Sequence, residues 1–125
     1  MSGMLEVIKG AGPHRVEFRV WDTQRGFVGC LTGGESPHVG GVVLAVPRPS
    51  LTGHGTSCDC WLTPVPGHLD LDLAVPIAKA ICKATGVPVS ITAGLHMDNA
   101  TGGDIETFSA NCAAAGEEML RLLTP

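Results

Sequence analysis

The chain has 125 residues, of which 44% are hydrophobic and 16% charged, and its formal net charge is −4. This length accommodates one hydrophobic core, so we predict a single domain over residues 1–125. An acidic chain without a run of Lys or Arg is not expected to bind nucleic acid or an anionic membrane. Its apolar runs are shorter than the roughly 20 residues of a membrane-spanning helix, and the apolar surplus indicates an oligomer interface.

Six strands are predicted from alternating apolar residues bounded by turn residues. They cover residues 4–10, 14–22, 27–32, 39–46, 56–65 and 87–93. The fourth is apolar on both alternating faces, which is typical of a central strand covered on both sides. The segment around it, residues 33–50, ends in two corners rich in Gly and Pro that also carry functional groups. We therefore interpret this segment as a binding frame.

Two helices are predicted after the fifth strand. The first begins at Asp70 or Asp72 and ends at Gly86, and its apolar residues recur every four positions. The second begins at Thr101, where Asp104 completes a capping box with Asp in place of Glu. Its periodicity predicts a buried face made of Ile105, Phe108, Cys112, Met119 and Leu122.

These elements predict an α+β fold with a mostly antiparallel sheet of about six strands. Short turns make neighbouring strands antiparallel, and the first helix makes the fifth and sixth strands a parallel pair through a right-handed crossover. Two helices can cover only one face of such a sheet. We therefore expect the other face to lie in a homodimer interface.

The five cysteines, Cys30, Cys58, Cys60, Cys82 and Cys112, are scattered along the chain. An odd count with three cysteines on apolar faces is typical of reduced core thiols in a cytoplasmic protein. The spacing of Cys58 and Cys60 places both on one strand face, which favours core packing over a zinc site. The N-terminal residues do not resemble a signal peptide, so we expect a cytoplasmic location.

Polar residues are predicted to gather at the two ends of the sheet. Tracing strand directions places His38, His68 and His96 on one edge, with Asp98, Asn99 and His14. The opposite end carries Arg48, Ser50 and His54, about 30 Å away at ~3.3 Å per residue. A dimer could bring the Arg48 end of one subunit to the histidine edge of the other.

Each of these groups also has a purely structural interpretation. A histidine at a Gly or Pro corner often only bonds the backbone, and residues 47–50 could be a rigid turn instead of a phosphate site. Gly33 and Gly34 could form a hairpin turn or an anion-binding nest. We assign no metal, and His38, His68, His96 and Asp98 form only a weak candidate set because their spacing lacks a metal-binding pattern.

Three blocks of the chain resemble the signature of the LpdD family, the D subunit associated with gallate and related hydroxyarene decarboxylases. They are GGESPHVGGVVLAVPRPS at residues 33–50, PGH at 66–68 and AGLHMDN at 93–99, in the family's order. The resemblance covers roughly residues 5–122. It implies a homodimeric prenylated-flavin chaperone, not an enzyme, with a fold similar to proteasome-assembly chaperones.

The resemblance further implies that the protein binds reduced prenylated FMN and helps to load it into a UbiD-type decarboxylase. Arg48 with Ser50 suits the phosphate, and Trp21, Trp61 and Met97 are available to the flavin ring, although core packing is the stronger expectation for either Trp. From the predicted geometry, and not from the resemblance, the cofactor-binding residues are expected to be Gly33, Gly34, His38, Arg48, Ser50, His68, His96, Asp98 and Asn99.

Two alternatives stay open at this point. The histidine edge could serve a small metal-dependent enzyme built on His38, His68, His96 and Asp98. The chain could also be a noncatalytic structural subunit of a decarboxylase complex.

Overall fold

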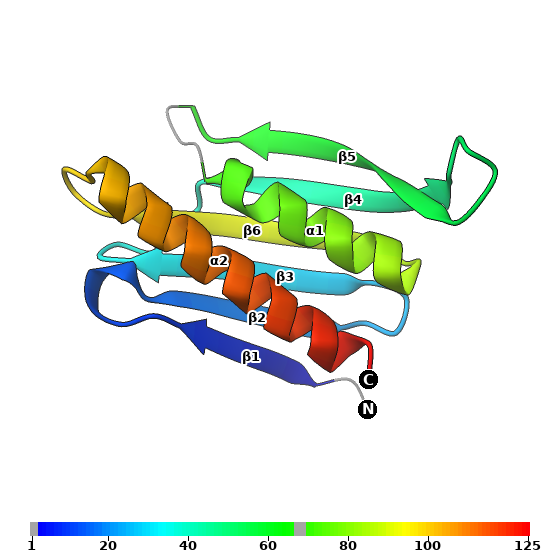
Figure 1. The fold of residues 1–125 in the computed structure, drawn as a ribbon, viewed down its shortest axis with the longest axis horizontal. Helices are drawn as coiled ribbons and strands as arrows, with labels where there is room; N and C mark the ends of the chain where they lie inside the picture. Colours follow the sequence, from blue (N-terminus) through cyan, green and yellow to red (C-terminus); the bar gives the residue numbers. More distant parts are fainter. Residues whose placement is uncertain (1–2, 67–69) are drawn as a thin grey trace.

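The computed structural model describes residues 3–66 and 70–125, which form one sheet layer covered by one helix layer (Figure 1). The elements follow the predicted order. They are β1 (Met4–Lys9), the short 3-10 helix η1 (Gly12–His14), β2 (Val16–Asp22), β3 (Phe27–Gly34), β4 (Gly41–Pro49), β5 (Thr56–Pro64), α1 (Leu71–Thr85), β6 (Val89–His96) and α2 (Gly102–Leu123). The predicted α+β class with a single six-stranded, mostly antiparallel sheet is confirmed.

The strand order is β1-β2-β3-β6-β4-β5, and it corrects the predicted neighbours. Strand β6 lies between β3 and β4, parallel to the first and antiparallel to the second. The predicted pairing of the fifth and sixth strands is therefore wrong, because β4 separates them. Strand β4 is also next to the edge strand instead of central. Residues 35–40 must cross the end of β6 to connect β3 with β4.

Both helices cover the same face of the sheet, and the core lies between the two layers (Figure 1). Its largest fully buried side chains are Phe18, Leu31, Ile81, Ile91 and Met119. The prediction that Ile105 and Leu122 are buried is wrong, since they are 58% and 47% exposed. Small residues face α1 instead. A Cβ atom on Gly116 would lie 2.8 Å from Cγ1 of Ile77, so the glycine permits close helix packing.

The opposite face of the sheet carries no helix and is apolar in part. The strand pairings place one row of side chains across all six strands, made of Met4, Trp21, Val28, Ser90, Leu44 and Trp61. Trp21 is 42% exposed and Trp61 59%, so the expectation that they pack in the core is wrong. We call this row the apolar row. It results from the single helix layer, which leaves every second strand residue uncovered.

The cysteines mostly pack in the core as free thiols. Cys58, Cys82 and Cys112 are buried, and Cys30 and Cys60 are half-buried. Burial raises the pKa of Cys82 to about 11 and that of Cys112 to about 12, so both thiols stay protonated at neutral pH.

Neither α1 nor α2, the α-helices of the described residues, is long and apolar enough to cross a membrane.

Candidate functional site

Polar side chains meet at the edge of the sheet where β3 and β6 end and β4 begins. We call Glu35, His38, Asp70, His96 and Asp98 the histidine rim. The structure brings His38, His96 and Asp98 together there, as the strand directions predict. The predicted member His68 lies outside the described residues.

Glycines allow the backbone of the rim to approach β6 closely. A Cβ atom on Gly94 would lie 1.5 Å from the carbonyl oxygen of His38, so the crossing loop passes directly over this glycine. Gly34 has a φ of 77°, and a Cβ there would lie 2.1 Å from the carbonyl oxygen of His96. Both contacts exclude larger residues because backbone atoms cannot move aside as side-chain ends do. The rim geometry is therefore fixed by the main chain.

Asp70 links three segments of the rim. Its Oδ2 lies 2.9 Å from Nε2 of His38 and accepts a hydrogen bond from the backbone N–H of Leu95 at 3.1 Å. Asp70 occupies the N-cap position of α1, yet its side chain makes no capping hydrogen bond. Sequence reasoning identified Asp70 only as a helix start. The available signal for its place in the rim is its position two residues after His68, a predicted rim residue.

His38 has hydrogen-bond acceptors at both ring nitrogens. Its Nδ1 lies 2.9 Å from the carbonyl oxygen of Ser36, and its Nε2 faces Asp70. The ring is 6.0 Å from that of His96, at an interplanar angle of 80°. The two imidazoles therefore meet edge to face.

His96 has a separate carboxylate partner. Its Nε2 lies 2.8 Å from Oδ1 of Asp98, and the backbone N–H of Asp98 donates to Oε1 of Glu35 at 3.1 Å. The side chains of His96 and Asp98 are 44% and 79% exposed. This pair, unlike His38 and Asp70, is open to a ligand from solvent. Asn99 follows in a left-handed conformation, with a φ of 53°, and is also exposed.

His14 lies at the same edge of the sheet but has its own network. Its Nε2 lies 2.8 Å from Oδ1 of Asp104, and its carbonyl oxygen accepts from Nδ2 of Asn111. Hydrogen bonds from the backbone and hydroxyl of Thr101 and from the His14 ring hold the pKa of Asp104 below its ordinary value. Asp104 also completes the predicted capping box of α2. This network fixes the start of α2 beside the rim.

Two further predictions concern the rim backbone and a metal. Of the two interpretations of Gly33 and Gly34, the hairpin turn is wrong, because both residues end β3 and pair with Leu95 and His96 of β6. Among residues 3–66 and 70–125, no group of three His, Cys, Asp or Glu side chains is placed to hold a metal ion.

The predicted phosphate residues lie at the opposite end of the sheet. Arg48 is seven residues along β4 from Gly41, a distance of about 23 Å. Its Nε donates to Oδ1 of Asp59 at 2.8 Å and its Nη1 to the carbonyl oxygen of Pro49. Ser50 bonds Thr52 in the adjoining loop, where His54 also lies. One subunit therefore cannot bring Arg48 to its own histidine rim.

A cavity of about 300 Å³ opens beside the rim, between the first turns of α1 and α2. We call it the rim cavity. Asp70 and His96 lie on its border with the rim. Most of its wall is apolar and is formed by Leu73, Leu95, Met97, Ala100, Ile105 and Phe108. Of these residues, the sequence predicts a contact with a ligand only for Met97. The others reach the cavity through packing between segments that are distant in the chain, which local sequence patterns do not reveal.

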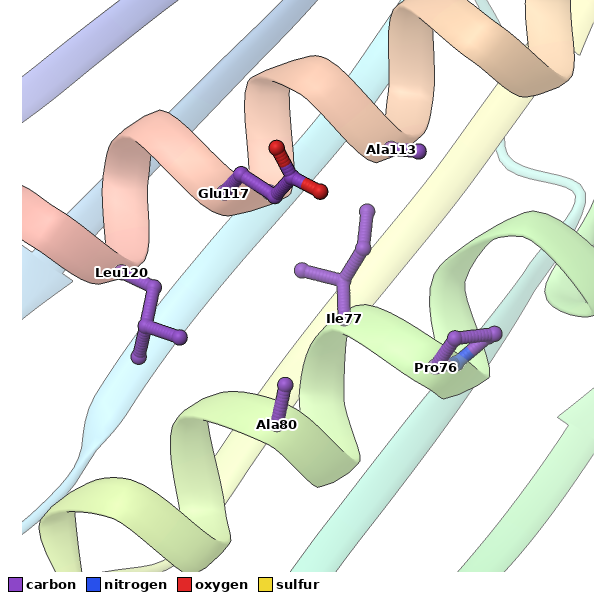
Figure 2. Close-up of a pocket in the computed structure, with 7 residues that line it drawn as sticks. Pro76, Ile77, Ala80, Ala113, Glu117 and Leu120 are labelled. Carbon is purple, nitrogen blue, oxygen red and sulfur yellow. The ribbon is translucent and has the colours of Figure 1, made fainter.

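A second hollow of about 180 Å³ lies between α1 and α2 on the outer side of the helix layer (Figure 2). Ile77 of α1 points toward α2, and Leu120 of α2 lies along the same groove (Figure 2). Glu117 is the one charged residue in its lining. This hollow is shallow and follows from the small residues that let the helices approach.

Comparison with known proteins identifies one family and one shared fold. The family model for the prenylated flavin chaperone LpdD-like domain matches residues 10–124. A chain from the crystal structure of a chaperone complex for yeast 20S proteasome assembly has the same fold, with a TM-score of 0.60 over 98% of this chain and 95% of that one. Their sequence identity is 13%, so this likeness concerns the fold alone. No curated protein matches the chain.

Proposed function

Because the chain belongs to the prenylated flavin chaperone LpdD-like family, we propose that it binds reduced prenylated FMN and helps to load it into a UbiD-type decarboxylase. In this role the protein carries the cofactor without catalysing decarboxylation. The free thiols of its five cysteines support a cytoplasmic location, where such a transfer would take place.

The observation that carries this proposal is the histidine rim with an apolar cavity beside it. A flavin presents hydrogen-bonding atoms along one side of its ring system and apolar edges elsewhere, so its binding site needs both kinds of surface. His96 with Asp98 supplies exposed polar groups, and the rim cavity supplies an apolar wall. His96 lines both, so a single planar ligand could contact the two surfaces at once.

The phosphate of the cofactor needs a cation, which the rim carboxylates do not offer. Arg48 is our candidate, with Ser50 as an additional donor. Beyond Ala45, β4 no longer pairs with β6 and continues with β5 as a two-stranded ribbon. This ribbon carries Arg48 away from its own rim, so we propose that it reaches the rim of a second subunit.

A homodimer through the helix-free face would provide this geometry. The apolar row crosses that entire face, and five of its six side chains are large hydrophobics between 39% and 59% exposed. A stable dimer typically buries about 800 Å² per subunit, roughly a tenth of the 6847 Å² surface of this chain.

Anaerobic titration with three ligands tests the proposed cargo. Reduced prenylated FMN, ordinary reduced FMN and oxidised FMN are each added to the protein, and the dissociation constants are measured by calorimetry. We expect the tightest binding for reduced prenylated FMN and about a hundredfold weaker binding for oxidised FMN, which is flat and lacks the added ring. Equal affinity for all three would contradict a dedicated chaperone.

A further inference from the structure

The rim cavity has features that the phosphate and the polar side of a flavin cannot explain. Its wall is mainly apolar, and Ile105 stands at it with 58% of its surface exposed. Phe108 and Leu95 form its buried parts. An exposed isoleucine next to a preformed apolar cavity is expected where a ligand covers both.

The charges around the cavity restrict what can enter it. Asp70 and Asp72 are its charged lining residues, and the first is already engaged by His38 and the backbone of Leu95. Two carboxylates oppose a phosphate or another anionic group. The carboxylates thus exclude an anion, and the mainly apolar wall favours an uncharged apolar occupant.

The volume of the cavity suits a small branched hydrocarbon. Apolar cavities of about 150 Å³ in proteins hold benzene, so about 300 Å³ accommodates a five-carbon unit together with the edge of an adjoining ring. A complete flavin mononucleotide with its ribityl phosphate is too large for it. The cavity thus fits one end of the proposed cargo.

From these observations we propose that the rim cavity is an isoprenoid subsite, which receives the five-carbon unit that distinguishes prenylated FMN from ordinary FMN. This assignment rests on the proposed function for the identity of the cargo. The subsite accounts for selectivity, since ordinary FMN lacks the five-carbon unit that fills it. His96, at the border of rim and cavity, then marks where the polar ring system meets the added carbons.

A fragment experiment tests the subsite without any flavin. The branched five-carbon alcohol 3-methyl-2-buten-1-ol is titrated into methyl-labelled protein and followed by NMR. We expect saturable shifts at the methyl groups of Leu73, Met97 and Ile105, and none at Leu122 on the far end of α2. Absence of shifts at the cavity, or equal shifts at Leu122, would overturn the subsite.

A pair of matched variants then tests selectivity with the whole cargo. Ala100 is exposed and lines the cavity from a loop, so Ala100→Trp fills the space without disturbing the core. Leu122→Trp adds similar bulk on the same layer, away from the cavity. If the prenylated flavin can no longer bury about two methylene groups in the cavity, its affinity falls roughly tenfold. We expect Ala100→Trp to reduce the preference for reduced prenylated over ordinary reduced FMN by about that factor, with Leu122→Trp unchanged.

The outcomes separate the subsite from the proposed function. If wild-type protein prefers the prenylated flavin and Ala100→Trp keeps that preference, the subsite is wrong while the chaperone function stands. A variant that weakens both flavins equally also overturns the subsite. If the wild-type protein binds neither flavin, the proposed function fails, and the alcohol titration still decides whether the cavity takes an isoprenoid group.

Discussion

Nε2 of His38 lies 2.9 Å from Oδ2 of Asp70, and this contact joins the crossing loop to the start of α1. The same carboxylate oxygen accepts from the backbone N–H of Leu95 in β6. Three segments that are distant in sequence therefore depend on one side chain, which is 11% exposed. The position of the histidine rim relative to the rim cavity follows from this one carboxylate.

Replacing Asp70 with Asn should loosen the rim. The variant loses the charge opposite His38, and hydrogen bonds to charged groups contribute about 1.5–3 kcal/mol. We expect urea unfolding to show a decrease of about that size in the free energy of unfolding. Asp72→Asn, two residues along and exposed, is the matched control and should change stability little. Equal effects of the two substitutions would mean that the link through Asp70 is unimportant.

Replacing Gly94 with Ala should displace the crossing loop. The new Cβ atom would overlap the carbonyl oxygen of His38, and neither backbone segment has room to move. We expect a loss of about 3 kcal/mol or more in the free energy of unfolding, together with loss of flavin binding. Gly103→Ala in α2 meets only the Thr101 hydroxyl at 3.7 Å and serves as control. A stable Gly94→Ala variant with normal binding would refute the described rim geometry.

Arg48 and Asp59 should affect flavin binding in opposite directions. Arg48→Ala removes the proposed phosphate ligand and should weaken binding of reduced prenylated FMN by about 1.5–3 kcal/mol. Asp59→Asn removes the carboxylate that holds Arg48, so the guanidinium becomes available and the affinity should rise. Calorimetry under anaerobic conditions measures both. If neither substitution changes the affinity, the phosphate is bound elsewhere.

Charges introduced into the apolar row should separate the proposed dimer. Trp61→Glu places a carboxylate at the β5 end of the apolar row, within the proposed interface. Because 59% of the Trp61 surface is exposed in the single chain, the fold should survive. Light scattering at micromolar concentration should give a dimer mass for wild-type protein and about 12.9 kDa for the variant. Leu122→Glu on the helix layer should remain dimeric. A wild-type monomer would remove the basis for a site shared by two subunits.

The stability contributed by Asp104 should depend on pH. Its pKa is lowered in the folded state, so its stabilising effect is complete above the ordinary carboxyl pKa of about 4 and disappears as the pH falls through the lowered value. Asp104→Asn should therefore be less stable than wild type at about pH 7, and the difference should shrink toward about pH 2. Glu106→Gln, exposed on the same helix, is the control. A difference independent of pH would indicate that the charge of Asp104 contributes nothing.

The sequence predicts the elements of this fold well and their neighbours less well. Alternation and turn residues locate every strand within a few residues, because both signals are local. The insertion of β6 between β3 and β4 depends on contacts such as Gly94 with His38, which are 56 positions apart in the chain. The turns alone therefore predict a wrong pairing, that of the fifth and sixth strands.

The site shows the same division between local and long-range information. Strand directions were enough to place His38, His96 and Asp98 on one edge, since direction is set by the turns. Asp70, which contacts His38, is absent from the predicted edge residues, because this contact depends on how α1 packs on the sheet. Trp21 and Trp61 were misplaced for a related reason. Hydrophobicity indicates burial, but it does not say whether the burial occurs within one chain.

Transfer of the cofactor tests the proposed chaperone function most directly. Apo decarboxylase is mixed anaerobically with reduced prenylated FMN, either free or already bound to this protein, and decarboxylase activity is measured after brief exposure to air in both cases. We predict a higher yield of active decarboxylase from the bound cofactor, and the same low yield from free cofactor and from cofactor mixed with the Gly94→Ala variant. Equal activation by free and protein-bound cofactor would contradict the chaperone function.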